Sequence, residues 1–266
     1  MNAPRPSAAW RARLAAAAVA PPLRPRVPLS CGSERIGSVE ADLFRRAGLA
    51  GGPLLRDDGP RGWRLGDGDP TRVFSQIADR LRATGLAHVW RDEQLVVRGE
   101  AGTAFGTIER GAVRALGIAT QAVHLTAVAP DGGVWVQQRA FDKPTDPGLW
   151  DTLVGGLVPV GESLEDGLAR ESWEEAGLRP QQLHSLRAGG CIATRRPMRE
   201  LAHGYIVEDL HWSTCVLAEG VRPANQDGEV AAFACMSPDA LCAALERDEF
   251  TVDAALILLA AHFAHP

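Results

Sequence analysis

The 266-residue sequence lacks several features that would assign it to a special class of protein. It has no run of about 18 apolar residues, so no membrane-spanning helix is predicted. Its five cysteines are scattered and form no C-x-x-C pair, which indicates reduced, mostly buried thiols in a cytoplasmic protein. Apolar residues (45%) and charged residues (23%) occur at the levels of an ordinary globular chain.

Lysine is nearly absent, because Lys143 stands alone against 27 arginines; we interpret this scarcity as genome composition. The net charge of −5 conceals a split between the two halves. Residues 1–120 carry 18 basic and 12 acidic side chains, a net of +6, and residues 121–266 carry 10 and 21, a net of −11. The arginines of the first half alternate with acids and form no dense run, so no nucleic-acid partner is predicted. The acidic half instead concentrates carboxylates that suit a metal ion.

The chain divides into an N-terminal extension (residues 1–25), a small α+β accessory domain (26–118) and a larger domain (119–266). The extension is rich in Ala and Arg and free of acids, as in a targeting segment. Its apolar stretch is weak and Pro21-Pro22 follow it, which favours a short helix over residues 8–20. An organelle-targeting segment stays open as the alternative.

In the accessory domain, residues 27–40 predict two strands around a polar turn, and residues 57–70, crowded with Gly, Asp and Pro, predict a loop. Helical spacing of apolar residues predicts a helix over 71–84. Residues 86–97 predict two strand pieces around a polar centre. No catalytic constellation is found in this half.

The larger domain starts with a hairpin, in which residues 121–129 and 134–139 flank a Pro-Asp-Gly-Gly turn. Mixed strands and segregated helices then predict an α+β sheet domain. The further strands are expected at 153–158, 188–195, 206–217 and 230–236, and the helices at 163–176, 238–247 and 252–263.

The helix expected at 163–176 carries the chemistry. Ser163 and Asp166 form a capping-box start, and Gly177 is a natural left-handed stop. At about 100° per residue, Glu171, Glu174 and Glu175 fall within one arc of roughly 100°. These like charges repel one another, so the cluster indicates a site for Mg²⁺ or Mn²⁺. An acidic, solvated helix face is the alternative for the three glutamates alone.

The opposite side of this helix carries small or apolar residues that can pack, among them Ser172 and Trp173. Arg170, one turn before Glu174, is the local counter-charge. The full spacing from Gly156 to Leu178 reads G-x5-E-x7-R-E-x-x-E-E-x-G-φ, where φ is apolar. This pattern resembles the Nudix box closely.

The resemblance implies a Nudix α/β/α sandwich with a mixed sheet, preceded by the small α+β domain. It implies metal binding by Glu174 and Glu175, and metal binding or base catalysis by Glu171. Arg170 and Glu162 match the pair that braces the loop and orients Glu171, and Gly155 or Gly156 matches the residue whose carbonyl reaches the metal. Ser172 departs from the usual bulky aliphatic residue, and we expect Trp173 to fill that space.

Other candidates come from the residues around the box. Glu229, on a loop entering a strand, is a candidate metal ligand or base, with a solvated turn acid as the alternative. Arg139 and Lys143 follow the hairpin and could meet phosphates, or lie on the surface. Trp150, Trp212 or Tyr205 could supply an aromatic wall for a substrate ring. His124, His203 and His211 lack metal spacing and are expected to be ordinary polar or core residues.

The first domain, with its basic excess, is expected to dock on the second and help to form the substrate pocket. Trp63 or Trp90 would then offer stacking surfaces, or else lie in the core.

Three further segments, 107–123, 141–156 and 225–236, resemble a Nudix subgroup that is related to thiamine pyrophosphokinase-associated proteins. That likeness implies hydrolysis of a small organic diphosphate, such as thiamine diphosphate or its oxidised analogues. Whether the chain forms a homodimer stays open. Nucleoside-diphosphate-linked substrates and a non-catalytic ligand-sensing module also remain open. An isopentenyl diphosphate isomerase would require a catalytic cysteine near the sheet, for which Cys191 and Cys215 are the candidates.

Overall fold

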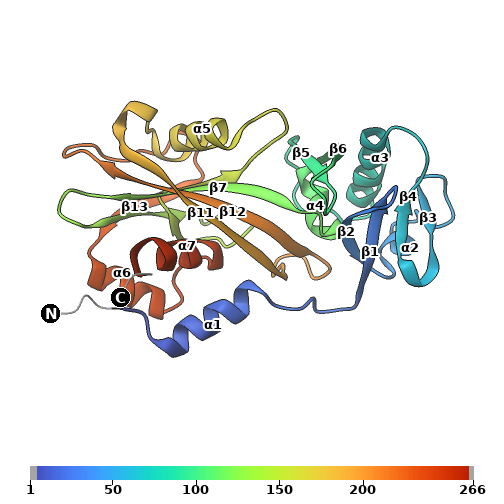
Figure 1. Ribbon diagram of the computed structural model, residues 1–266, viewed down its shortest axis with the longest axis horizontal. Helices are drawn as coiled ribbons and strands as arrows, with labels where there is room; N and C mark the ends of the chain where they lie inside the picture. Colours follow the sequence, from blue (N-terminus) through green and yellow to red (C-terminus); the bar gives the residue numbers. More distant parts are fainter. Residues whose placement is uncertain (1–4, 264–266) are drawn as a thin grey trace.

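The computed structural model describes residues 5–263. A small N-terminal α+β region lies at one end of the elongated molecule, and a large sheet covered by helices lies at the other (Figure 1). The chain starts beside the large sheet, crosses to the small region and then returns (Figure 1). None of the helices among residues 5–263 has the length and apolar character needed to cross a membrane.

The first helix, α1 (Ala8–Ala18), packs against the C-terminal helices and not against the region that follows it. The Ser7 hydroxyl caps it by accepting from the Trp10 N–H. Trp10, 2% exposed, and Leu14 lie in one apolar cluster with residues of α6 (Pro238–Glu246) and α7 (Val252–Phe263). The predicted helix is confirmed and ends two residues early, where the Ala20 N–H donates to the Arg195 carbonyl.

The N-terminal region contains a four-stranded sheet in the order β2-β1-β4-β3 and a separate hairpin, β5-β6. The predicted hairpin around residues 27–40 is confirmed as β1 and β2. In chain order the elements are β1 (Arg26–Cys31), β2 (Glu34–Glu40), α2 (Leu43–Arg46), β3 (Leu55–Asp57), β4 (Trp63–Leu65), α3 (Pro70–Ala83), β5 (Gln94–Arg98), β6 (Ala104–Glu109) and α4 (Arg110–Leu116).

Two predictions for this region are wrong in part. Residues 57–70 are not all loop, because β4 pairs with both β1 and β3 and buries Trp63 against Phe44, with ring centroids 5.3 Å apart. Residues 86–90 form no strand, because the N–H of Leu86 bonds to the end of α3 and that of His88 bonds to the Gly111 carbonyl. Only the second expected piece, β5, is a strand.

The large sheet has the order β11-β12-β7-β8-β13, with β10 paired to β7 and β9 paired to β8. The β7–β12 pair is parallel and the other pairs are antiparallel, so the sheet is mixed. Its strands are β7 (Thr120–Val128), β8 (Val134–Arg139), β9 (Trp150–Thr152), β10 (Val154–Leu157), β11 (Leu183–Pro197), β12 (Tyr205–Leu217) and β13 (Val230–Met236).

Helix α5 (Leu164–Ala176) covers one face of this sheet, and α6, α7 and α1 lie across the other (Figure 1). The predicted α+β class, with a sheet between helical layers, is therefore confirmed. The short strand β9 was not anticipated, because three residues are too few to show a period.

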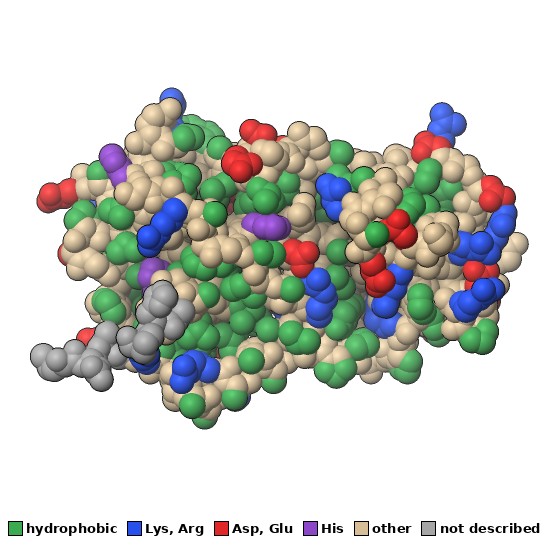
Figure 2. Space-filling view, in the orientation of Figure 1, with side chains coloured by type: hydrophobic (Ala, Val, Ile, Leu, Met, Phe, Trp, Pro, Cys, Tyr) green, Lys and Arg blue, Asp and Glu red, His purple; other side chains and the backbone are tan. Residues whose placement is uncertain are grey.

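One apolar core joins the two parts of the molecule, since the cluster around Leu29, Phe74 and Ile108 continues to Leu210 and Ile257. Figure 2 shows that, on the face it presents, basic side chains alternate with acidic ones and form no continuous stripe.

Candidate active site

Helix α5 begins and ends where its sequence requires. The Ser163 hydroxyl accepts from the Asp166 N–H (3.1 Å), and the Asp166 carboxylate accepts from the Ser163 N–H (3.3 Å). Gly177 ends the helix with a left-handed φ of 63°. The buried side chains Leu168 and Ala176 pack among residues of β7 and β10, and this contact fixes which face of the helix meets the sheet.

Trp173 was expected to pack inward and fill the space beside Ser172, and this prediction is wrong. This ring is 44% exposed and lies under the Arg179 guanidinium, 5.0 Å from its centroid. Ser172 is fully buried, and its hydroxyl donates a hydrogen bond to the Leu168 carbonyl of the same helix (2.6 Å). A small hydroxyl that bonds to its own helix therefore needs no neighbour to fill the space.

Arg170 ties the acidic face of α5 to the loop before it. Its Nε donates to Glu162 Oε1 (3.0 Å), and its Nη1 donates to Glu171 Oε1 (2.8 Å) and to Glu174 Oε2 (2.9 Å). Its Nη2 reaches the Leu157 carbonyl (3.1 Å). Burial opposes the charge, but these partners raise the pKa of Arg170, so the guanidinium is a fixed cation that orients all three carboxylates.

Glu175 is the most deeply buried acid of the helix, with 1% exposure. Its Oε2 accepts from Gln137 Nε2 (2.8 Å) and from the Gly155 N–H (2.8 Å), and Lys143 Nζ lies 3.6 Å from its Oε1. Burial nevertheless raises the pKa of Glu175 to about 8. The protein thus holds this carboxylate in place while leaving its charge incompletely compensated.

Glu171 lies against the backbone of β10. A Cβ built on Gly156 would come within 1.9 Å of Glu171 Oε1, so only glycine leaves room for the carboxylate. Burial raises the pKa of Glu171 as well, in opposition to Arg170. The two glycines therefore have different tasks, because Gly155 donates to Glu175 and Gly156 makes space for Glu171.

The three glutamates do not form a ready-made metal cage. Among residues 5–263, no three Asp, Glu, His or Cys side chains are gathered closely enough to hold an ion together. Each acid instead has a basic neighbour, since Arg170 contacts Glu171 and Glu174 and Lys143 lies near Glu175. The donors still fit a hard divalent cation, since they are carboxylate oxygens whose burial raises the pKa of both Glu171 and Glu175.

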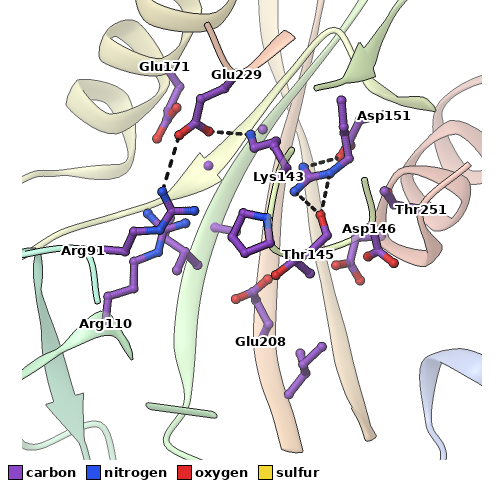
Figure 3. Close-up of a pocket in the computed structure, with 18 of the residues that line it drawn as sticks. Arg91, Arg110, Lys143, Thr145, Asp146, Asp151, Glu171, Glu208, Glu229 and Thr251 are labelled. Carbon is purple, nitrogen blue, oxygen red and sulfur yellow. Dashed lines mark hydrogen bonds and ion pairs between the residues drawn. The ribbon is translucent and has the colours of Figure 1, made fainter. Parts of the chain in front are cut away.

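Lys143 and Glu229 complete this part of the site. The Lys143 ammonium, 10% exposed, contacts the Glu229 carboxylate (Figure 3), and it lies 3.6 Å from Glu175 Oε1. Burial opposes ionisation, but Lys143 lowers the pKa of Glu229 and keeps it charged. The Ala140 N–H donates to the Glu229 carbonyl (2.9 Å), which joins the loop after β8 to the start of β13.

Lys143, Glu229, Glu171 and Glu174 line a cavity of about 380 Å³ between α5, the sheet and the N-terminal region (Figure 3), whereas Glu162 and Glu175 lie outside its lining. The cavity brings together most of the predicted site residues, namely Gly155, Gly156, Arg170, Glu171, Glu174, Glu229, Arg139 and Lys143. Arg139 is committed to structure, because it donates to the Thr145 carbonyl (2.9 Å) and to Asp151 (3.2 Å).

The predicted aromatic wall lies elsewhere. Trp150 packs into the cluster of α6 and α7, Trp212 covers Gly189, and the Tyr205 hydroxyl donates to the Ala20 carbonyl. Trp63 is core, and Trp90 lies beneath Arg82 (4.4 Å). None of these rings lines the cavity in the described part of the chain, where polar and charged groups predominate and the aromatic rings present are the imidazoles of His88 and His124.

The cavity has a far end, away from α5, that the sequence did not reveal. Four carboxylates meet three arginines there, a formal excess of one negative charge; they are Asp146, Asp151, Glu208 and Asp253 with Arg114, Arg139 and Arg196. Burial raises the pKa of Asp146 and of Asp253, and Asp253 Oδ1 is buried without a hydrogen-bond partner within residues 5–263. This end therefore favours a group that donates hydrogen bonds or carries positive charge.

No cysteine is among the residues that line the cavity in the part of the chain described. Cys191 is exposed on β11, and Cys215 is buried in the sheet, where burial raises the pKa of its thiol to about 12. The expected position for a catalytic thiol is therefore not filled.

Residues 119–257 match the NUDIX domain family. The chain is 27% identical over 207 residues to "Nudix hydrolase 20, chloroplastic" of Arabidopsis thaliana, which covers 74% of this chain and 53% of that protein. It is 32% identical over 117 residues to the isopentenyl-diphosphate Delta-isomerase of Kocuria rhizophila, which covers 44% and 62%. The chain spans about half the length of the first curated relatives it matches.

Among solved structures, the crystal structure of DR0079 from Deinococcus radiodurans is similar to this fold, with a TM-score of 0.51 at 22% sequence identity. The superposition covers 64% of this chain and 99% of that chain. At this identity the likeness supports the fold and leaves the chemistry to the residues of the cavity.

Proposed function

The chain belongs to the Nudix family, and from this premise we propose that it is a pyrophosphohydrolase that cleaves the diphosphate of a small organic molecule. One observation carries the proposal. Glu171 and Glu174 of α5, the Arg170 brace and Lys143 line the same cavity as arginines of the N-terminal region, with Glu175 buried behind Lys143. Carboxylates to hold a cation and basic groups to hold phosphates are the two requirements of diphosphate cleavage.

Glu171, Glu174 and Glu175 would hold Mg²⁺ or Mn²⁺, which neutralises phosphate oxygens and makes bound water more acidic when present. Lys143 is placed to contact a phosphate at the edge of this acidic face. Glu171, oriented by Arg170 and lying against Gly156, is the group we assign to take the proton of the attacking water. Water adds to phosphorus, the bridging oxygen leaves, and the products are an organic monophosphate and phosphate.

For the organic half of the substrate, we propose thiamine diphosphate or an oxidised analogue. The subgroup resemblance supports this choice, and so does the acidic far end of the cavity, because a thiazolium cation and an amino group suit a net negative charge and the unpaired Asp253 Oδ1. The predicted Trp and Tyr rings supply no stacking wall, since they lie outside the cavity. The absence of a thiol from the described cavity wall speaks against isomerase chemistry.

The test is a parallel measurement of kcat/KM with Mg²⁺ for thiamine diphosphate, its oxidised forms, dinucleotides, nucleotide sugars and isopentenyl diphosphate. We expect the thiamine compounds to rank first and to release phosphate. A nucleotide substrate that exceeds them at least tenfold would refute the thiamine assignment and keep the hydrolase. Binding without any turnover would favour a ligand-sensing module, and product isomerisation would favour the other enzyme class.

A further inference from the structure

We propose that Arg91 and Arg110, both from the N-terminal α+β region, bind the diphosphate group, so that this region forms part of the active site. The inference rests on the proposed function for the identity of the ligand. The two residues are chosen from their positions in the structure. They lie neither in the large sheet nor in the box between Gly156 and Leu178.

The buried carboxylate of Glu109 holds together the two backbone segments that carry Arg91 and Arg110. Glu109, 2% exposed, accepts from the Arg91 N–H (2.8 Å), the Glu93 N–H (3.1 Å) and the Gly111 N–H (3.2 Å). The Arg110 N–H donates to the Glu93 carbonyl (2.8 Å). The loop that carries Arg91 and the helix start that carries Arg110 are therefore held together as one unit by these hydrogen bonds.

This unit is attached directly to the loop that precedes α5. The Val160 N–H, which follows β10, donates to the Gln94 carbonyl at the start of β5 (2.8 Å). The shared apolar core of the two parts lies behind this contact. The distance between the two arginines and the α5 acids is thus fixed by the fold, as a substrate clamp requires.

The two guanidinium groups retain donors for a ligand. In residues 5–263, the Arg91 guanidinium has no hydrogen bond to a protein group, and its nearest carboxylate, Glu229 Oε1, is 3.8 Å from Nη1. Within the same residues, the Arg110 guanidinium makes one hydrogen bond, from Nη1 to Glu93 Oε2 (2.7 Å). Arg114, by contrast, donates to both Thr120 and the buried Glu208, which marks it as structural.

Both side chains point into the cavity from the same side, toward Glu229 and Glu171 (Figure 3). An acidic helix face alone would repel a diphosphate, and two guanidinium groups opposite it offset that repulsion. Planar guanidinium groups also match phosphate oxygens with paired hydrogen bonds. Two arginines of the basic first half of the chain would thus contact the diphosphate.

The experiment compares full-length R91Q, R110Q and the double variant with R72Q, a control from the same region whose side chain is 85% exposed. Binding of inorganic pyrophosphate with Mg²⁺ is measured by calorimetry, and kcat and KM are measured on the preferred diphosphate. We expect the double variant to raise both the Kd and the KM at least tenfold, with R72Q within twofold of the wild type. R110K should recover part of the loss, since it keeps the charge and loses the paired geometry.

A double variant that binds pyrophosphate within twofold of R72Q would overturn the proposal. If the double variant loses its fold by circular dichroism, the two single variants and R110K decide by the same criterion. Failure of the wild type to hydrolyse any diphosphate would refute the proposed function alone. Loss of pyrophosphate binding in R91Q and R110Q would still support this site, and unchanged binding would still reject it.

Discussion

Glu175→Gln should stabilise the metal-free protein while it removes activity. Burial raises the pKa of Glu175 from 4.5 to about 8 in the fold, and the side chain is almost fully enclosed. Below pH 4.5 the acid is protonated in both the folded and the unfolded chain, and it then has no effect. As the pH rises from there to about 8, the unfolded chain releases the proton first, so folding loses stability over this window.

The magnitude follows from the same two pKa values. Each pH unit between them costs about 1.4 kcal/mol, so the acid lowers the free energy of unfolding by about 3 kcal/mol at pH 7. A glutamine cannot ionise, and its carbonyl oxygen can still accept from the Gly155 N–H. The variant should therefore match the wild type within about 1 kcal/mol at pH 5 and exceed it by several kcal/mol at pH 8.

Urea unfolding in EDTA at pH 5, 7 and 8 measures this difference, with Glu165→Gln on the exposed side of the same helix as the control. In Mg²⁺, turnover of E175Q should fall at least 100-fold, and the cation should no longer raise its thermal midpoint. A stability difference that is independent of pH, or a variant less stable than the wild type at pH 8, would refute the electrostatic reasoning. Full activity in saturating Mg²⁺ would refute the metal assignment.

Trp10→Ala should cost about 3 to 5 kcal/mol in urea unfolding, because the ring fills the cluster beneath α6 and α7; a loss below 1 kcal/mol would show that α1 is dispensable. Burial lowers the pKa of His262 to about 4, so its neutral form is favoured in the fold and stability falls as the pH drops from 6.5 toward 4. His262→Gln should flatten that part of the pH–stability curve, and an unchanged slope would contradict this. Gly156→Ala should lower kcat at least tenfold by displacing Glu171, with Gly52→Ala, whose Cβ has room, as the unaffected control.

The sequence predicted the parts of the site that local rules determine. The cap at Ser163, the stop at Gly177 and the spacing of the glutamates on α5 depend on neighbours within a few residues. Apart from β9, the strands of the large sheet were likewise located to within about five residues, because apolar stretches between turns leave few alternatives.

The parts that depend on distant contacts were not predictable. Strand β4 lies in a stretch crowded with Gly, Asp and Pro, and only its pairing with β1 makes it a strand. Arg91 and Arg110 look like any exposed arginine in the sequence, since nothing local shows that Glu109 turns them toward α5. The predicted aromatic wall was wrong for the same reason. Only the fold shows that Trp150 packs against the C-terminal helices and not against a ligand.

Lysine scarcity, which we interpreted as genome composition, has a practical consequence once Lys143 is located. The one lysine side chain of the chain lies between Glu175 and Glu229, inside the cavity. Reagents that acylate or alkylate lysine amines can therefore reach no lysine without entering the site, so biotinylation or resin coupling through lysine would compromise the enzyme. The same fact makes an isotopically labelled methyl group on Lys143 a reporter at a single position, whose resonance would register each ligand that enters the cavity.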